Sequence, residues 1–122
     1  MEIDTLKCKK IELVDQNGKC TMVLHANDGG GIILLMGETT HMEISISENN
    51  GAQIHMTNTF EGKSVPCLTI GAFKDETAGV ICRDSKGLAR VVAGYDGDIK
   101  KSVISYNGKV LKEIRDYYNN PS

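Results

Sequence analysis

Residues 79–94, with the sequence GVICRDSKGLARVVAG, decide the fold of this chain. One β-prone run leads into the turn Asp84–Gly87, and a second β-prone run leads away from it. Aspartate at the first position of a four-residue turn can bond the backbone two residues on, and glycine at the fourth position relieves steric crowding. The stretch therefore predicts a β-hairpin closed by a tight turn.

The same device recurs along the chain. Turns are predicted, alternately tight and loose, at residues 15–18, 27–31, 48–51, 58–62, 74–79, 84–87, 96–98 and 106–108. Strands are expected between them at residues 11–15, 21–26, 32–36, 42–47, 52–57, 67–70, 80–82, 89–95 and 99–106. Repeats of roughly this length are typical of periodic architectures. The sequence thus predicts one all-β domain over residues 1–122. We expect an antiparallel hairpin-repeat of short strands, arranged as a prism, a solenoid or a rolled sheet.

The unit at 79–94 resembles bacterial and phage-associated repeats of the form strand, D-x-x-G-x-x-R, strand. Arg90 stands at the arginine position of that pattern. An earlier stretch matches it at Asp15 and Gly18, with Thr21 in place of the arginine, and residues 107–108 keep only the turn. The resemblance covers most of the chain loosely. It implies a hairpin-repeat fold and no particular activity.

Three segments leave more than one interpretation open. The Gly29–Gly31 run predicts a loop or a close approach of two backbones, because three ordered glycines lose much backbone entropy. Pro66 indicates a strand start or an edge strand. Residues 109–118 fit either a last strand or an amphipathic helix, and we expect a strand that turns helical near the end.

Composition argues against several partners. The net charge of −2 gives no basic patch for nucleic acid or for an anionic membrane. The longest apolar run is far shorter than the roughly 20 residues of a membrane span. The first ten residues lack the apolar stretch of a signal peptide. We therefore expect a cytoplasmic protein that binds neither nucleic acid nor membrane.

Metal-ligating and nucleophilic residues are scattered through the sequence. The cysteines follow no C-x-x-C spacing, and with no secretory signal we expect reduced, mostly buried thiols at Cys8, Cys20, Cys67 and Cys82. The histidines His25, His41 and His55 lack the close spacing of metal ligands. Alternation places His41 and His55 on one sheet face and leaves His25 unassigned.

No grouping of residues points to catalysis. Asp75 and Glu76 are interpreted as exposed loop acids. Asp96 and Asp98 could contact calcium together with Asn107, but they lie in no known calcium-loop pattern. The sequence also lacks the G-x-S-x-G elbow of serine hydrolases. We therefore assign no catalytic, cofactor-binding or metal-binding residue, and the protein is expected to act without enzymatic chemistry or a cofactor.

The clearest hairpin joins residues 42–47 to residues 52–57, which both alternate strictly between apolar and polar side chains. Directly paired residues share a face, so an odd loop is required. A three-residue loop at 49–51 predicts that Ile46 faces Ile54 and that Ser45 faces His55.

Ile32–Met36 is apolar at every position, which indicates a strand covered on both faces. The aromatic-poor composition, with no Trp and two Phe, favours thin layers over one large core. We therefore expect a structural or protein-interaction module that forms a homo-oligomer, a trimer or a dimer, through Ile32–Met36. The alternative is a β-barrel that binds a small molecule.

Overall fold

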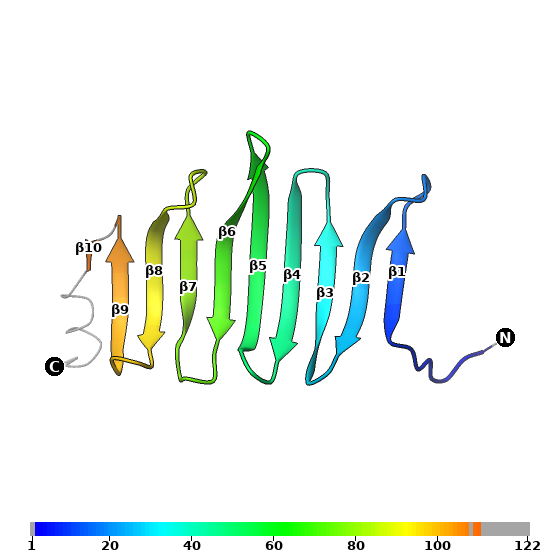
Figure 1. Cartoon of the computed structure of the whole chain (residues 1–122), viewed down its shortest axis with the longest axis horizontal. Helices are drawn as coiled ribbons and strands as arrows, with labels where there is room; N and C mark the ends of the chain where they lie inside the picture. The colour runs from blue at the N-terminus through cyan, green and yellow to red at the C-terminus, as the bar shows by residue number, and fades with distance from the viewer. Residues whose placement is uncertain (1, 108, 111–122) are drawn as a thin grey trace.

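The computed structural model describes residues 2–107 and 109–110. These residues form one antiparallel sheet in which every strand pairs with its neighbours in the sequence (Figure 1). The strands are β1 (Lys10–Val14), β2 (Cys20–Asn27), β3 (Gly30–Met36), β4 (Thr40–Ser47), β5 (Gly51–Phe60), β6 (Lys63–Ala72), β7 (Ala78–Arg83), β8 (Ala89–Asp96), β9 (Lys101–Tyr106) and β10 (Lys109–Val110). The predicted all-β hairpin fold is confirmed.

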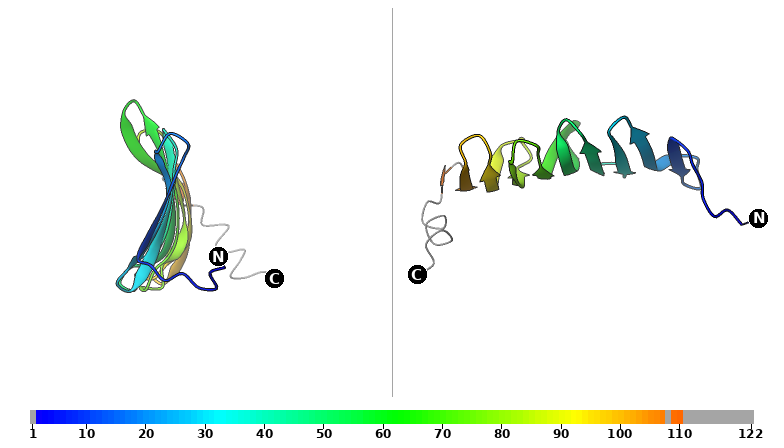
Figure 2. Two further views of the ribbon diagram at one scale, coloured as in Figure 1. Left: turned by 90° about the vertical axis from the view of Figure 1, so that its right-hand side faces the viewer. Right: turned by 90° about the horizontal axis from the view of Figure 1, so that it is seen from below.

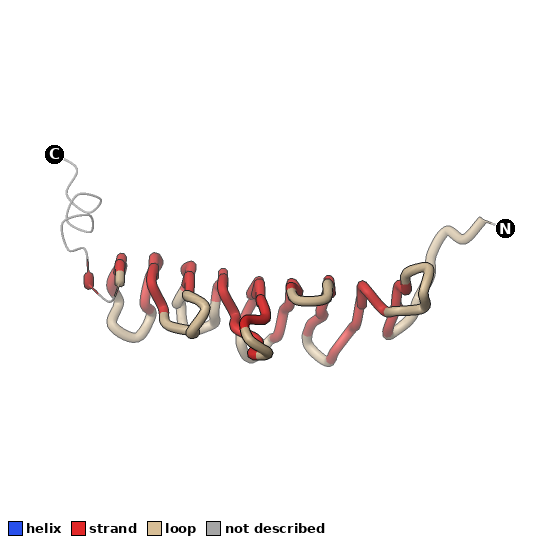
Figure 3. The backbone as a smooth tube through the Cα atoms, turned by 90° about the horizontal axis from the view of Figure 1, so that it is seen from above, coloured by secondary structure: helices blue, strands red, loops and turns tan. Residues whose placement is uncertain are grey.

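The sheet is a single open layer. Strand order runs from β1 to β10 without a crossover, so β1 and β10 lie at opposite ends. Seen along its edge, the sheet is a gently curved row of strands with no second layer over the described residues (Figures 2 and 3). β10 begins where a last strand was expected. The expected helical turn falls at residues 111–118, which lie outside the described residues.

The two aspartate turns are built alike, at the upper edge of the sheet in Figure 1. Gly18 N donates to Asp15 O at 3.0 Å, and Gly87 N donates to Asp84 O at 2.9 Å. In each turn the aspartate Oδ1 also accepts two backbone N–H groups, at 2.8–3.0 Å. The local chemistry read from the sequence therefore closes both hairpins.

A β-bulge follows each of these turns. Cys82 pairs with Val91 and Arg83 with Ala89, which leaves Arg90 as the extra residue. Leu13 pairs with Met22 and Val14 with Cys20, which leaves Thr21 in the same position. The last position of the D-x-x-G-x-x-R pattern is thus the bulge residue. Arg90 also pairs with the turn aspartate, its Nε lying 2.7 Å from Asp84 Oδ2.

This pairing predicts a stability difference that depends on pH. The hydrogen bond from Leu88 N, with those from Arg90 and Lys86, holds the pKa of Asp84 below its ordinary value of 3.8. A lowered carboxyl pKa stabilises the fold above 3.8, and the stabilisation is lost as pH falls through the folded-state pKa. Asp84→Ala should therefore lower Tm by a few degrees at neutral pH, and by more than Asp15→Ala, which has no arginine partner. Thermal unfolding followed by circular dichroism should show the two variants converging well below pH 3.8. A gap that persists in acid would contradict this role for the carboxylate.

The register of the β4–β5 hairpin corrects the prediction. Ile44 pairs with Ile54 and Ser47 with Gly51, so the loop is residues 48–50. Ile46 faces Ala52 and not Ile54, while the predicted parity of the faces holds. Gly51 has a left-handed φ of 96°, yet it begins the strand. The carbonyl oxygen of Ala72 also lies 2.2 Å from where its Cβ would be, so glycine is required there both by the predicted left-handed φ and by the neighbouring strand β6.

Two further segments differ from their predicted loops and edges. Gly30 and Gly31 belong to β3, and only residues 28–29 form the turn. The close-approach interpretation is confirmed at Gly30, where the Ile46 carbonyl oxygen lies 1.8 Å from the position of a Cβ. Pro66 lies inside β6, opposite Thr57 and beside the bulge residue Cys67. Proline is tolerated there because a bulge interrupts the ladder of hydrogen bonds.

Very little of this sheet is buried. Among the described residues the only side chains in the buried class are those of Val23, Val65 and Thr69, at 7–8% exposure, joined by the glycine Gly97, and no large side chain is completely buried. A single layer has two solvent-facing sides, so it cannot enclose a core of its own.

Candidate interaction surface

One face of the sheet carries an unbroken apolar surface. Direct pairing puts partners on the same face, so one row of side chains can be followed from β1 to β9. This middle row consists of Ile11, Leu24, Ile33, Ile44, Ile54, Ile70, Val80, Ala93 and Ile104. It contains no polar residue.

Two more rows flank the middle row on the same face. The long row, nearer the aspartate turns, consists of Leu13, Met22, Leu35, Met42, Met56, Leu68, Cys82, Val91 and Tyr106. The small row, nearer the opposite edge, consists of Ala26, Gly31, Ile46, Ala52, Ala72, Ala78, Tyr95 and Ser102. The three rows together are called the apolar face, and it bears no charged side chain.

The apolar face is more open to solvent than the face behind it. In β4, Ile44 and Ile46 are 36% and 59% exposed, whereas Glu43 and Ser45 on the other side are less exposed and fall in the half-buried class. Of the three buried side chains, Val23 and Thr69 lie on the other side, and Val65, paired with Asn58, lies beyond the long row on the apolar side. A soluble monomer buries its isoleucines and exposes its glutamates, so this order is inverted. Exposed apolar surface of this extent is typical of an interaction site.

The other side of the sheet, called the mixed face, has a polar centre. Glu43, His55 and Thr69 follow one another across β4, β5 and β6. The Thr69 hydroxyl lies 3.1 Å from His55 Nδ1 and accepts a hydrogen bond from Arg83 at 3.1 Å. Arg83 also donates to Pro66 O at 3.3 Å. These contacts give the buried Thr69 hydroxyl and the half-buried Arg83 guanidinium hydrogen-bond partners, as buried polar groups require.

Ile32–Met36 contributes to both faces, as predicted. Ile33 and Leu35 belong to the apolar face. Ile32, Leu34 and Met36 lie on the mixed face, where Leu34 packs between the strands that carry Val23 and Glu43. β3 lies between β2 and β4, so its apolar side chains are flanked by those of both neighbours on each face of the sheet.

The histidines all lie on the mixed face. His41 and His55 share it as predicted, and His25, paired with Lys10 and Ile32, joins them there. They sit on three different strands and in three different rows. Within residues 2–107 no group of three or more His, Cys, Asp or Glu side chains is placed to hold a metal ion.

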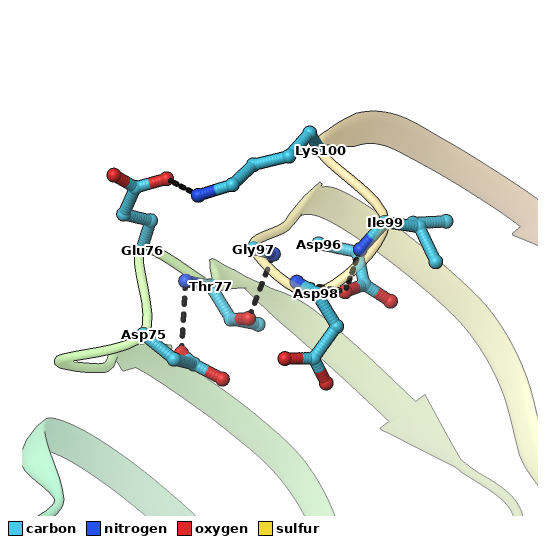
Figure 4. A network of polar contacts seen from close by, with 8 residues as sticks. All are labelled: Asp75, Glu76, Thr77, Asp96, Gly97, Asp98, Ile99 and Lys100. Atoms are coloured by element: carbon cyan, nitrogen blue, oxygen red, sulfur yellow. Dashed lines mark hydrogen bonds and ion pairs between the residues drawn. The ribbon is translucent and has the colours of Figure 1, made fainter.

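The acidic residues of the β6–β7 and β8–β9 turns take part in a network of hydrogen bonds and one ion pair (Figure 4). Asp75 Oδ1 accepts Thr77 N at 3.0 Å, and Thr77 Oγ1 accepts Gly97 N at 2.9 Å. An ion pair between Glu76 and Lys100 bridges the same two loops. Asp96 Oδ1 accepts the backbone N–H of Asp98 at 2.9 Å. Asp75 and Asp96 therefore each stabilise their own turn, while the Thr77 hydroxyl and the Glu76–Lys100 ion pair join the β6–β7 and β8–β9 turns.

The calcium grouping considered from the sequence is not assembled. Asp96 ends β8 at the lower edge of the sheet in Figure 1, whereas Asn107 follows β9 at the upper edge. Asn107 N instead donates to Arg90 O at 2.7 Å. The full length of β9 separates the two, so they cannot share an ion.

The cysteines are less buried than predicted. All four are free thiols; Cys8 is exposed, and Cys20, Cys67 and Cys82 are half-buried. Cys82 shares the apolar face with Val80, as the parity of the strand indicated. A single-layer sheet has no interior in which to bury them, and this is why the prediction failed.

An apolar hollow lies over the β1–β4 part of the apolar face. It has a volume of about 390 Å³ and is open to solvent. Ile11, Leu24, Ile33, Ile44 and Ile46 contribute to its lining, together with Cys8 and Lys9. The hollow therefore borders the apolar face, and Lys10, His25, Ile32 and Ser45 of the mixed face also contribute to its lining.

Comparison with protein-family models, with curated proteins and with solved structures found no match in any of the three. No helical segment of the described chain has the length and apolar character that would be needed to cross a bilayer.

Proposed function

We propose that this protein is a non-enzymatic structural or protein-interaction module that works as a homo-oligomer, with its apolar face as the contact surface. The observation that carries the proposal is the continuity of that face. Two rows of uncharged side chains run across β1 to β9 and a third across β2 to β9, and three of their isoleucines, Ile44, Ile46 and Ile70, are 36–59% exposed. Each large aliphatic side chain gains roughly 1.5–3 kcal/mol when it is buried.

A second copy is the occupant best matched to this surface. At about 4.8 Å between strands, β1 to β9 span roughly 40 Å, and five residues of strand add about 17 Å, a footprint of roughly 600–700 Å². Two such faces together reach the size of a standard stable interface, about 1,200–2,000 Å². Apart from Lys9 beside Ala26 at the β1 end, the face carries no charge that would select a charged partner. Sheet-on-sheet packing is the usual way to cover such a face.

Assembly in this form couples oligomerisation to folding. The chain buries hardly any side chain by itself, and a sheet without a core has little to offset its loss of conformational entropy. Contacts between copies would supply that missing core. The function proposed is accordingly that of a building block, and no step of chemistry is assigned to it.

The test is the mass of the protein in solution together with its thermal stability. Size-exclusion chromatography with light scattering should give two or three times the 13.3 kDa chain mass. Tm should rise as protein concentration rises, because the folded state is stabilised by mass action. A monomer at high micromolar concentration, with a Tm independent of concentration, would remove the proposal. A single ligand bound by that monomer would favour the small-molecule alternative, with the hollow over β1–β4 as its site.

A further inference from the structure

The apolar face is graded in side-chain size across its width. Along β5 the gradation reads Met56 in the long row, Ile54 in the middle row and Ala52 in the small row. The neighbouring strand β6 repeats it with Leu68, Ile70 and Ala72, whereas β4 has Ile46 and β8 has Tyr95 in the small row. Apart from Ile46 and Tyr95, the small row contains only Ala, Gly and Ser.

A graded face packs on a copy of itself in only some orientations. If long rows met long rows, the layer between the sheets would be thick along one side and empty along the other. Protein interiors are close-packed, and voids of that kind are costly. If the long row of one copy meets the small row of the next, the layer has even thickness.

We propose that the copies assemble with the long row of one chain packed against the small row of the next, with the middle rows meeting at the centre. This rests on the proposed function, and it adds the orientation of the partner. Strands that pack on each other then point their long-row ends toward opposite edges of the shared layer. Two symmetries satisfy the rule: a two-layer dimer with its two-fold axis across the strands, and a three-sided trimer with its axis across the strands.

Both symmetries bring the same strand of two copies together at the centre of the sheet. In either, Met56 of β5 lies against Ala52 of β5 in the neighbouring copy. In contrast, Met56 and its own counterpart lie apart, as do the two Ala52 residues. Within one chain, positions 52 and 56 are separated by four residues of strand, roughly 13 Å. A disulfide needs Cα atoms within about 7 Å, so this pair cannot close inside one chain.

The experiment is disulfide trapping in a background where Cys8, Cys20, Cys67 and Cys82 are replaced by alanine. The double variant Ala52→Cys/Met56→Cys, oxidised and run on a non-reducing gel, should lose its monomer band. A covalent dimer or a covalent trimer is expected. Either supports the packing of long row against small row, and the size of the product gives the stoichiometry. Each single variant should remain uncrosslinked.

The matched control is Gln53→Cys/Thr57→Cys, which has the same spacing on the same strand but lies on the mixed face. It should stay monomeric on the gel. Light scattering of each variant before oxidation separates the two proposals. If the protein is an oligomer but Met56→Cys alone crosslinks, or the double variant fails to crosslink, the packing of long row against small row is wrong and the proposed function still stands. A monomer would overturn both.

Discussion

Ile33→Asp combined with Leu35→Asp is expected to dissociate the oligomer. Ile33 is in the middle row and Leu35 in the long row, and Leu35 is 39% exposed in the isolated sheet. Losing two buried aliphatic side chains removes roughly 3–6 kcal/mol per copy. That weakens association by about two to four orders of magnitude, before the cost of burying two carboxylates is added. Light scattering should therefore report a monomer, with part of the chain unfolded by circular dichroism.

The control for this prediction lies on the next strand. Glu43→Asp combined with Ser45→Asp keeps one carboxylate and adds a second on the mixed face, opposite Leu34 and Ile32. Because that face stays outside the proposed interface, the mass in solution should match that of the unaltered protein. If both pairs of substitutions dissociate the oligomer equally, the assignment of the interface to the apolar face is wrong.

Gly30→Ala is expected to be far more damaging than Gly31→Ala, although the two glycines are adjacent. A Cβ at Gly30 would lie 1.8 Å from the Ile46 carbonyl oxygen, and that atom belongs to the backbone and cannot rotate away. Forcing β3 and β4 apart there should cost roughly 1–3 kcal/mol or more. At Gly31 the nearest atom is the His25 carbonyl oxygen at 3.5 Å, an ordinary contact.

Gly31→Ala should accordingly be neutral, or it should stabilise the fold by about 0.4–1 kcal/mol, since alanine restricts the unfolded chain. Urea unfolding at one fixed protein concentration measures both variants on the same scale. Equal midpoints for the two variants would show that the Ile46 carbonyl can move aside at little cost. In that case the close approach of β3 and β4 would not require glycine.

The strand pattern was open to prediction because its causes are local. Alternating apolar and polar residues, aspartate at turn starts and glycine at turn ends each act over a few residues, and the Asp15 and Asp84 turns form as predicted. The turn at residues 37–39 was not singled out, since it has neither feature beyond Gly37. The bulges at Thr21 and Arg90 were visible only as a recurring position in the D-x-x-G-x-x-R pattern.

Glycine is required for different physical reasons at different positions. Gly18 and Gly87 take left-handed φ values near 80° and face open space, so they serve the turns, as the sequence indicated. Gly30 is a glycine because a neighbouring backbone occupies the position of a Cβ, and Gly51 combines this cause with a left-handed φ of 96°. The two causes look alike in the sequence, and this is why the β4–β5 loop was placed one residue too late.

The sequence by itself determined the elements: the hairpins, their turns and the parity of their faces. It does so because backbone dihedrals and side-chain alternation are set by neighbours along the chain. Only the tertiary structure decided that nine of these strands align their apolar parity into one face, and that nothing in the described residues covers it. That outcome depends on the register of every pair, and a shift by one residue at a single pair would turn all later strands over.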